Sequence, residues 1–382
     1  MISLRYSQSN PIIYGPGTIN TLGTEAQTLG CTKVMLISGP TGPKRDAYKA
    51  GLKSLQDAGI AVVEFNEIPG DPPDYIIDKG GEIAVREKVD GIVAIGGGSP
   101  MDAAKGINVL LKNPPPINNY FGKPFTPYVP VILVPTTAGT ASEVNAVCVF
   151  TDTKNHLKRS VRCSATLGIL DPELTVSMPP ATTAATAMDA FAHCAESITS
   201  KDWNPKSELL ATKALSLSVA NCRLAMDKPD NIEARSNMLL AANFAGIAFS
   251  SSMIHLGHGI AHSLGARLHI THGIGCALQI PEVMRFLSVS KPDKVRVVGE
   301  AIGVSFAGRE TPEEIGEMVA TAIHQHIHSI EIPSLSAQGF SRDEVVACAE
   351  LVPSDPVMNF IPVPITVAEI EKILGDMYDN YT

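Results

Sequence analysis

Continuous apolar runs alternate with amphipathic segments through the first third of the chain. The runs lie at residues 33–38, 60–65, 91–95 and 129–135. A strand that is buried on both faces of a parallel sheet has this composition, whereas a half-exposed strand alternates apolar with polar residues. Segments 46–58 and 74–88 have the period of an amphipathic helix. The pattern therefore predicts strand–helix–strand units with right-handed crossovers.

The hydrophobic pattern changes twice further along the chain. From Val147 to about Leu174 there are short runs typical of strands, separated by turns. After Pro180 nearly everything has helical periodicity and is rich in Ala and Leu. A chain of 382 residues is long enough for two cores. We therefore expect an α/β domain with a parallel sheet at 1–180 and an all-α domain at 181–382.

Composition narrows the class of protein. Hydrophobic residues make up 45% of the chain and charged residues 18%, which is typical of an ordered globular protein. A net charge of −9 argues against a nucleic-acid partner. We find no apolar run long enough to span a membrane and no signal-peptide pattern at the start. The seven cysteines are scattered without a C-x-x-C pair, which favours reduced thiols and a cytoplasmic location.

Two loops at predicted strand ends are suited to phosphate binding. Gly96-Gly-Gly-Ser-Pro100 joins a strand to a helix, and Thr136-Thr-Ala-Gly-Thr-Ala-Ser142 follows the next strand. Glycines let the backbone approach a phosphate, and a helix N-terminus offers free N–H groups to its charge. The glycines could also merely turn the chain, and the G-x-G-x-x-G fingerprint is absent. Because ligands lie at the strand ends of open α/β sheets, the two loops indicate a nucleotide in a Rossmann-like domain.

A histidine-rich stretch in the second domain suggests a metal site. Residues 257–273 contain four imidazoles, of which His258 and His262 are four apart and share a helix face, while His272 follows a short loop. An i,i+4 pair with a later third donor is a familiar ligand spacing for iron, zinc and related ions. A lone histidine is more often a core or surface residue, but the clustering favours a metal.

Other histidines divide into possible ligands and bystanders. Asp189 and His193 are again four apart, so a carboxylate and an imidazole project together from one helix face. We expect His255 and His269 to be bystanders. Metal could also be bound non-enzymatically by His324-Gln-His326-Ile-His328, but residues two apart diverge on a helix, so we expect that segment to be a solvated surface.

Taken together, the motifs resemble those of the iron-containing (group III) alcohol dehydrogenases. They are Gly96-Gly-Gly-Ser-x-x-Asp-x-Ala-Lys105, Pro135-Thr-Thr-Ala-Gly-Thr-x-Ser-Glu143-Val, Met188-Asp-Ala-x-x-His193 and His258-Gly-x-Ala-His262 with His272-Gly. Four motifs in the family's order, spread over nearly the whole chain, carry the resemblance. It implies a dinucleotide-binding domain, a helical domain, and a cleft between them for NAD(P) and one divalent ion.

The resemblance also assigns residues to roles. The family's metal ligands match Asp189, His193, His258 and His272. His262 matches a histidine that stands beside the nicotinamide without binding metal, and we expect it to act in catalysis as a proton relay. The positions that match cofactor contacts are Gly97, Gly98, Ser99, Asp102, Thr136, Thr137 and Lys158. Iron(II) is implied as the native ion, and the ligand types also permit zinc, manganese or nickel.

The implied activity is an NAD(P)-linked alcohol dehydrogenase or aldehyde reductase. Hydride would pass between nicotinamide C4 and the carbon of a small alcohol or aldehyde bound to the ion. The family often ends its second strand with a carboxylate that contacts the adenosine ribose, whereas Gly39 stands there in this sequence, so we expect NADP(H) to be preferred over NAD(H). A homodimer or higher homo-oligomer is expected from the family and from the frequency of two-fold dimers.

Three departures from the family pattern leave the substrate open. Asn145 replaces the usual Thr after Ser-Glu-Val, His255 adds an imidazole before the first metal histidine of its motif, and the segment 158–162 is short and basic. Two alternatives to the dehydrogenase also stand. One is a metal- and NAD-dependent lyase or cyclase of the dehydroquinate-synthase type, although the Lys and Arg density that its substrate needs is not evident. The other is a non-enzymatic metal-binding protein.

Overall fold

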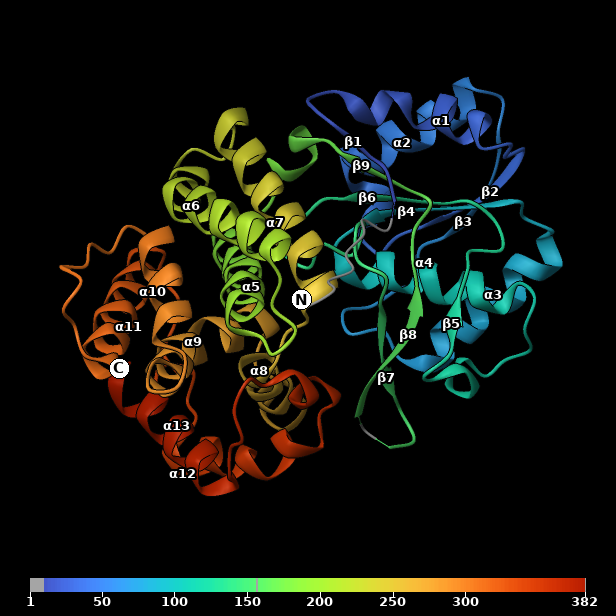
Figure 1. Ribbon diagram of the computed structural model, residues 1–382. Helices are drawn as coiled ribbons and strands as arrows, with labels where there is room; N and C mark the ends of the chain where they lie inside the picture. The colour runs from blue at the N-terminus through green and yellow to red at the C-terminus, as the bar shows by residue number, and fades with distance from the viewer. Residues whose placement is uncertain (1–9, 156, 382) are drawn as a thin grey trace, which may run out of the picture. The chain divides into compact units, whose positions relative to one another are not determined.

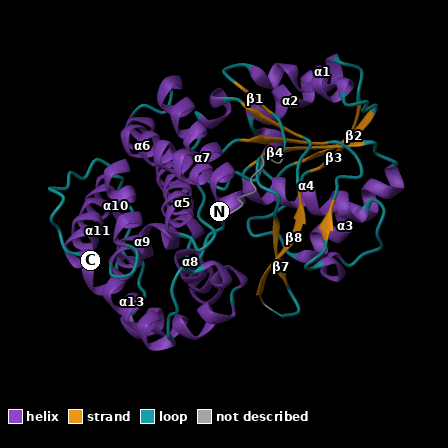
Figure 2. Ribbon diagram, viewed as in Figure 1, coloured by secondary structure: helices purple, strands orange, loops and turns teal. Residues whose placement is uncertain are grey.

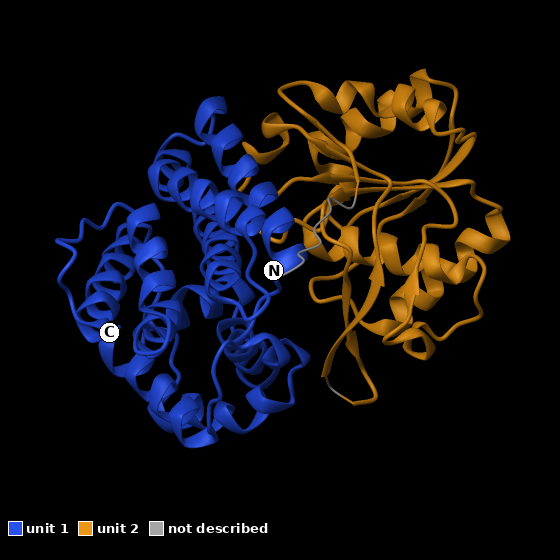
Figure 3. Ribbon diagram, in the orientation of Figure 1, with its two compact units in different colours: residues 1–7, 179–382 blue, residues 8–178 orange. Residues whose placement is uncertain are grey.

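The computed structural model of the chain describes residues 10–155 and 157–381. These residues divide into two compact units that meet in sequence between Met178 and Pro179 (Figure 3). The assignment of cofactor binding to residues 1–180, and of metal binding and catalysis to residues 181–382, stays a prediction.

The α/β unit (orange in Figure 3) is built on a six-stranded, fully parallel sheet (Figures 1 and 2). Its strands, in spatial order, are β1 (Ile12–Tyr14), β9 (Leu167–Leu170), β6 (Val131–Pro135), β4 (Gly91–Gly96), β2 (Lys33–Ile37) and β3 (Ala61–Phe65). The central strands β2, β4 and β6 are buried almost throughout, as their apolar runs predict. The parallel α/β prediction is therefore confirmed.

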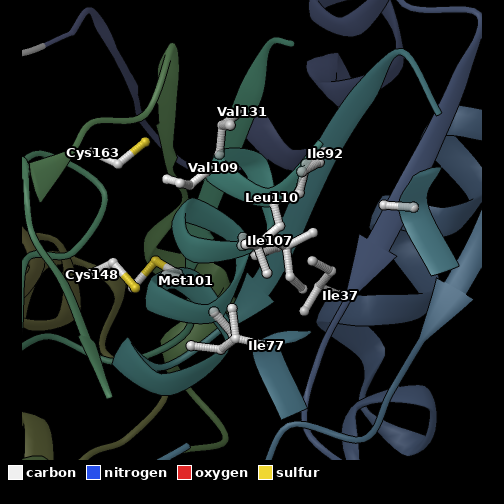
Figure 4. Packing of buried hydrophobic residues seen from close by; sticks show 14 of the residues in the cluster. Ile37, Ile77, Ile92, Met101, Ile107, Val109, Leu110, Val131, Cys148 and Cys163 are labelled. Atoms are coloured by element: carbon white, nitrogen blue, oxygen red, sulfur yellow. The ribbon is translucent and has the colours of Figure 1, made fainter. Parts of the chain in front are cut away.

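Helices cover both faces of this sheet. They are α1 (Leu22–Thr28), α2 (Asp46–Asp57), α3 (Asp74–Glu87) and α4 (Gly98–Leu110). Alternate residues of one strand enter different cores, because successive side chains of a strand point to opposite faces. Leu36 packs in the cluster that contains residues of α1 and α2, whereas Ile37 packs in the cluster that contains Ile77 of α3 and Ile107 of α4 (Figure 4).

A smaller sheet lies within the same unit. It consists of β5 (Pro124–Phe125), β8 (Leu157–Cys163) and β7 (Cys148–Asp152), with β7 and β8 antiparallel. Strands β7 and β8 lie among the short β-type runs that the sequence predicts after Val147, whereas β5 precedes them and is not predicted by the pattern. Short 3-10 segments interrupt the chain at η1 (Thr18–Thr21), η2 (Gly42–Lys44), η3 (Ile117–Tyr120), η4 (Pro172–Thr175), η5 (Ala347–Ser354) and η6 (Pro356–Phe360).

The helical unit (blue in Figure 3) contains helices and no strand among its described residues, as predicted. Its helices are α5 (Pro180–Thr199), α6 (Pro205–Asp227), α7 (Ile232–Ser252), α8 (Leu256–Leu268), α9 (His272–Ser288), α10 (Pro292–Ala301), α11 (Pro312–Ser329), α12 (Arg342–Val346) and α13 (Val367–Asn380). Helix α5 is buried along most of its length, so polar residues on it need partners inside the protein.

None of the helices in the described part of the chain is, alone, both long and apolar enough for a membrane span. Helices α7 and α8 are long and apolar enough only when they are taken together, and the two helices are bent by 108° relative to each other.

Candidate functional site

One carboxylate oxygen gathers three histidines in the helical unit. Asp189 Oδ1 lies 3.6 Å from His193 Nε2, 3.6 Å from His258 Nε2 and 3.4 Å from His272 Nε2. Donors about 2.1 Å from a tetrahedral ion are separated by about 3.4 Å, so the spacing suits one small divalent cation. The structure thus brings together the four residues that the sequence analysis selects as ligands.

The close approach of two helices sets part of this geometry. A Cβ atom on Gly273 would lie 2.0 Å from the carbonyl oxygen of Ala185, so glycine is required where α9 meets α5. Gly273 directly follows His272, and Ala185 lies one turn before Asp189 on α5. Because the two backbones touch here, the histidine at the start of α9 is held next to the carboxylate of α5.

A buried glutamate orients another of the histidines. Glu196 Oε1 lies 2.7 Å from His258 Nδ1, which leaves Nε2 of that ring directed at Asp189. Glu196 Oε2 accepts a hydrogen bond from the backbone N–H of His255, just before α8 begins. Carboxylates commonly fix metal-binding imidazoles in this way. No sequence motif assigns Glu196 a role, although it lies three residues after His193 on the same helix.

The protonation of these groups reflects an excess of negative charge. Burial alone would raise the pKa of Asp189, but the positive charge of His272 and the hydrogen bonds from His258 and His272 hold it well below its usual range. Burial would also lower the pKa of His272, yet Cys276 and Asp189 raise it to about 10. A divalent cation that binds here would displace the protons that the nearby acidic groups stabilise on the imidazoles. The donor set therefore fits a metal ion in both charge and spacing.

His193 has a different environment from the other histidines. Burial lowers its pKa to about 3, so the ring is neutral and keeps a lone pair available to an ion. The ring stacks between Phe249, at 4.4 Å, and His258, at 4.6 Å. Its Nδ1 atom is buried without a hydrogen-bond partner among the described residues. The stacking, in place of a hydrogen bond, fixes the orientation of this ring.

His262 is held by a second carboxylate. Its Nδ1 lies 2.7 Å from Asp355 Oδ2, and its ring stacks on His272 with the centroids 5.4 Å apart. Its side chain is 24% exposed, so its second nitrogen can exchange protons. Asp355 precedes η6 and also accepts the backbone N–H of Val357. No local pattern could have selected Asp355, because 93 residues separate it from its partner.

The remaining histidines lie outside this cluster. His255 Nε2 lies 2.9 Å from the hydroxyl of Thr199, and His269 is an exposed residue that ends α8 with a φ of 57°. In α11 the expectation of a solvated histidine surface is wrong in part. His328 is exposed, but His324 and His326 are half-buried because α11 packs on other helices, and His326 stacks on Phe191 of α5.

The two predicted phosphate loops lie side by side in the α/β unit. They follow β4 and β6, which are neighbours in the sheet, and the N–H of Thr136 donates to the carbonyl of Gly96. A Cβ on Gly98 would lie 2.8 Å from the Thr140 side chain, so glycine permits this approach. Helix α4 begins here with neither a side-chain cap nor an acidic residue in its first turn. Its free N–H groups suit a phosphate.

Of the other predicted cofactor residues, some lie at this carboxyl edge of the parallel sheet and one lies in the smaller sheet. Gly39 follows β2, the neighbour of β4, and therefore lies at the same carboxyl edge. The hydroxyl of Ser99 accepts the backbone N–H of Asp71, and Lys158 of β8 forms an ion pair with the Asp71 carboxylate. A Cβ on Gly97 would lie 3.5 Å from the Thr137 side chain, which is an ordinary van der Waals contact.

Asp102 has internal partners for both carboxylate oxygens. Oδ1 accepts from the Ser142 hydroxyl at 2.5 Å and lies 3.0 Å from Lys105 Nζ, while Oδ2 accepts from the N–H of Val149. The fully buried Lys105 ammonium also donates to Asn145 Oδ1. Asp102 therefore holds the second loop against α4, and Asn145, the departure from the family pattern, belongs to the same network.

Comparisons with known proteins cover almost the whole chain. Residues 9–172 match the family model described as iron-containing alcohol dehydrogenase, and residues 183–378 match that of the Fe-containing alcohol dehydrogenase family, C-terminal. The chain is 30% identical to an NAD-dependent methanol dehydrogenase of Bacillus methanolicus, covering 95% of this chain and 96% of that protein.

Two further relatives show the same breadth of coverage. An NADPH-dependent butanol dehydrogenase of Clostridium saccharobutylicum is 30% identical, with 98% of each chain covered. A crystal structure of a 1,3-propanediol oxidoreductase superposes with a TM-score of 0.93 at 32% identity, covering 98% of this chain and all of the other.

Proposed function

This chain belongs to the iron-containing alcohol dehydrogenase family and is an oxidoreductase, and we propose that it interconverts a small alcohol and its aldehyde with NADP(H) and one divalent ion. The observation that carries the proposal is the approach of His193, His258 and His272 to one oxygen of Asp189, at distances of 3.4–3.6 Å that suit ligands of a single cation. Neither the lyase nor the non-enzymatic alternative is favoured, because both family models and the relatives describe alcohol dehydrogenases.

We propose Asp189, His193, His258 and His272 as the residues that hold the ion. Iron(II) is the proposed native metal, and zinc, manganese and nickel suit the same donors. The ion supplies Lewis acidity toward the alcohol oxygen when bound, and the nicotinamide supplies the hydride donor and acceptor. The protein fixes the donors in advance, through the Gly273 contact and the Glu196 hydrogen bond.

His262 is proposed as the catalytic proton relay. Asp355 holds its Nδ1, so that Nε2 is the nitrogen that takes and returns the proton of the alcohol. Burial lowers the pKa of this imidazole and the Asp355 carboxylate opposes that shift. His262 is therefore a partly exposed base, and its affinity for a proton depends on the Asp355 carboxylate.

The proposed cofactor contacts are in the α/β unit. We assign the pyrophosphate to the loops at Gly97, Gly98, Ser99 and Thr136–Thr137, next to the uncapped N-terminus of α4. Asp102 and Lys158 are proposed to support the same region. Gly39 is proposed to favour NADP(H), because no carboxylate at the end of β2 repels a 2′-phosphate there.

The oligomeric state, the location in the cell and the partners of the enzyme are also proposals. We propose a homodimer or higher homo-oligomer in the cytoplasm, with a small alcohol or aldehyde as partner and no nucleic acid or membrane. The net charge of −9 and the seven cysteines without a disulfide support this setting. Two-fold dimers are the commonest soluble oligomers.

A steady-state screen tests the proposed reaction. The protein is loaded anaerobically with Fe²⁺ and assayed with small aldehydes from two to four carbons, each with NADPH and with NADH. We expect oxidation of the nicotinamide that requires both metal and aldehyde. The absence of turnover with every aldehyde, by protein whose iron content is confirmed by elemental analysis, would contradict the proposal.

A further inference from the structure

A cysteine lies among the proposed metal ligands. Cys276 follows His272 by one turn of α9, so the two side chains share a helix face. Its sulfur lies 3.6 Å from His272 Nε2, 3.9 Å from His258 Nε2 and 3.9 Å from Asp189 Oδ1. The residue is fully buried. Its sulfur therefore faces three of the donors that are proposed to hold the ion.

These separations agree with coordination geometry. With an ion–sulfur bond of about 2.3 Å and ion–nitrogen bonds of about 2.1 Å, sulfur and nitrogen ligands of one ion lie about 3.1–3.8 Å apart for bond angles of about 90–120°. Asp189, His258, His272 and Cys276 each offer one donor atom, and these four atoms lie within 4.8 Å of one another. The sulfur thus completes a set of donors around the position that suits the cation.

In three of the other cysteines, the sulfur atom hydrogen-bonds to a backbone carbonyl oxygen. Cys31, Cys163 and Cys348 direct their sulfur atoms to backbone carbonyl oxygens of Asp90, Ser164 and Glu344. Such contacts satisfy a thiol without selecting any ion. The sulfur of Cys276, in contrast, contacts side-chain atoms of Asp189, His258 and His272, and each of these atoms can itself bind a metal.

We propose that Cys276 supplies its sulfur to the ion as a thiolate, in addition to Asp189 and the histidines. The thiol proton passes to solvent when the ion enters, and the thiolate left behind offsets one of the two positive charges of the ion. The inference rests on the proposed function, because it concerns the same ion. A soft sulfur donor favours zinc and cobalt over manganese and magnesium, so this residue biases which metal the protein retains.

Cobalt substitution gives a readout that does not depend on activity. Co²⁺ is added to the metal-free full-length protein, and its content is measured by elemental analysis. We expect visible d–d bands together with a near-ultraviolet thiolate-to-cobalt charge-transfer band. Cys276→Ser should keep the bound cobalt and lose the charge-transfer band. Cys222→Ala removes a buried thiol of α6 and should keep both.

Two results separate failure of this inference from failure of the proposed function. Wild-type protein that holds stoichiometric cobalt without a charge-transfer band overturns the role of Cys276 and leaves the four-residue site intact. Wild-type protein that binds no cobalt overturns the metal site and the inference together.

X-ray absorption at the zinc edge decides the question even where variants do not fold. The zinc-loaded wild-type protein should show one sulfur neighbour at about 2.3 Å. A shell of nitrogen and oxygen alone overturns the proposal. In competition titrations, Cys276→Ser should weaken zinc binding by about 10- to 100-fold and change manganese binding by less than about 3-fold.

Discussion

Asp355 Oδ2 lies 2.7 Å from His262 Nδ1, and this contact joins the residue before η6 to the middle of α8. The contact fixes the imidazole with its proton on Nδ1 and its lone pair on Nε2. Burial lowers the pKa of His262, and the carboxylate partly reverses that effect. The two residues therefore act as a unit whose proton affinity can be changed by substituting either one.

Asp355→Asn should lower kcat by about 10- to 100-fold, because an amide stabilises the imidazolium less than a carboxylate. The same change should move the His262-dependent limb of the pH–rate profile to lower pH. The measurement is kcat against pH at saturating cofactor. Glu350→Gln, which neutralises an exposed carboxylate of the neighbouring η5, should leave the profile unchanged. A profile that does not move in Asp355→Asn would count against the relay.

His272→Ala should empty the metal site, whereas His262→Ala should keep its metal. The reason is that His272 Nε2 lies 3.4 Å from Asp189, while His262 directs a nitrogen to Asp355. Elemental analysis after gel filtration measures the metal content of both variants. We expect less than about a tenth of the wild-type content in His272→Ala, since a lost ligand weakens a four-donor site severely. Full occupancy in that variant would refute the ligand assignment.

Gly39→Asp should shift the cofactor preference from NADPH toward NADH by about 10- to 100-fold in kcat/KM, since a carboxylate repels a 2′-phosphate. A Cβ at this position would lie 3.1 Å from the carbonyl oxygen of Ile68, so any side chain perturbs the loop slightly. Gly39→Ala separates this steric effect from the charge. The idea is wrong if Ala and Asp change the preference equally, or if the unmodified enzyme uses NADH as well as NADPH.

His326 should make the protein less stable in mild acid. Burial lowers its pKa from 6.5 to about 4, so the unfolded chain binds a proton that the folded chain refuses. This contribution to stability is present above about pH 6.5 and is lost as the pH falls toward 4. The wild-type protein should lose unfolding free energy when the pH falls from 7 to 5. In His326→Phe that loss should be smaller by about 1–2 kcal/mol. Urea unfolding at both pH values measures this.

His328→Phe is the matched control for that experiment, because His328 is an exposed residue of the same helix. It should retain the acid sensitivity of the wild type. Equal curves for His326→Phe and the wild type would show that His326 is protonated in the folded state.

Light scattering should give at least twice the 40.4 kDa mass of one chain at micromolar concentration. The measurement is made with cofactor and metal present and again without them. A mass near that of a single chain under both conditions would contradict the proposed homo-oligomer.

The sequence predicts those parts of the fold and site that depend on local spacing. Buried parallel strands follow from continuous apolar runs such as Val131–Pro135, and the pair Asp189 and His193 follows from a separation of four on a helix. Glu196 and Cys276 lie at helical spacings from proposed ligands, yet spacing alone does not show that their side chains are buried beside the donors.

Contacts between distant segments could not be predicted in this way. The partner of His262 lies 93 residues away, and its approach depends on how η6 folds back on α8. The alternating histidines of α11 illustrate the same limit. Residues two apart do diverge on a helix, but the packing of neighbouring helices buries part of His326, which a pattern within one segment does not reveal.

The contact between Gly273 and the Ala185 carbonyl has a consequence for which ions can enter. Two backbones already in contact leave the donors on α5 and α9 little freedom to move apart. Calcium needs six to eight oxygen ligands at about 2.3–2.6 Å, which would require a wider cage. For the proposed metal site, we therefore expect Gly273 to make binding depend on ionic radius, and we expect a substitution there to enlarge the cage before it removes any ligand.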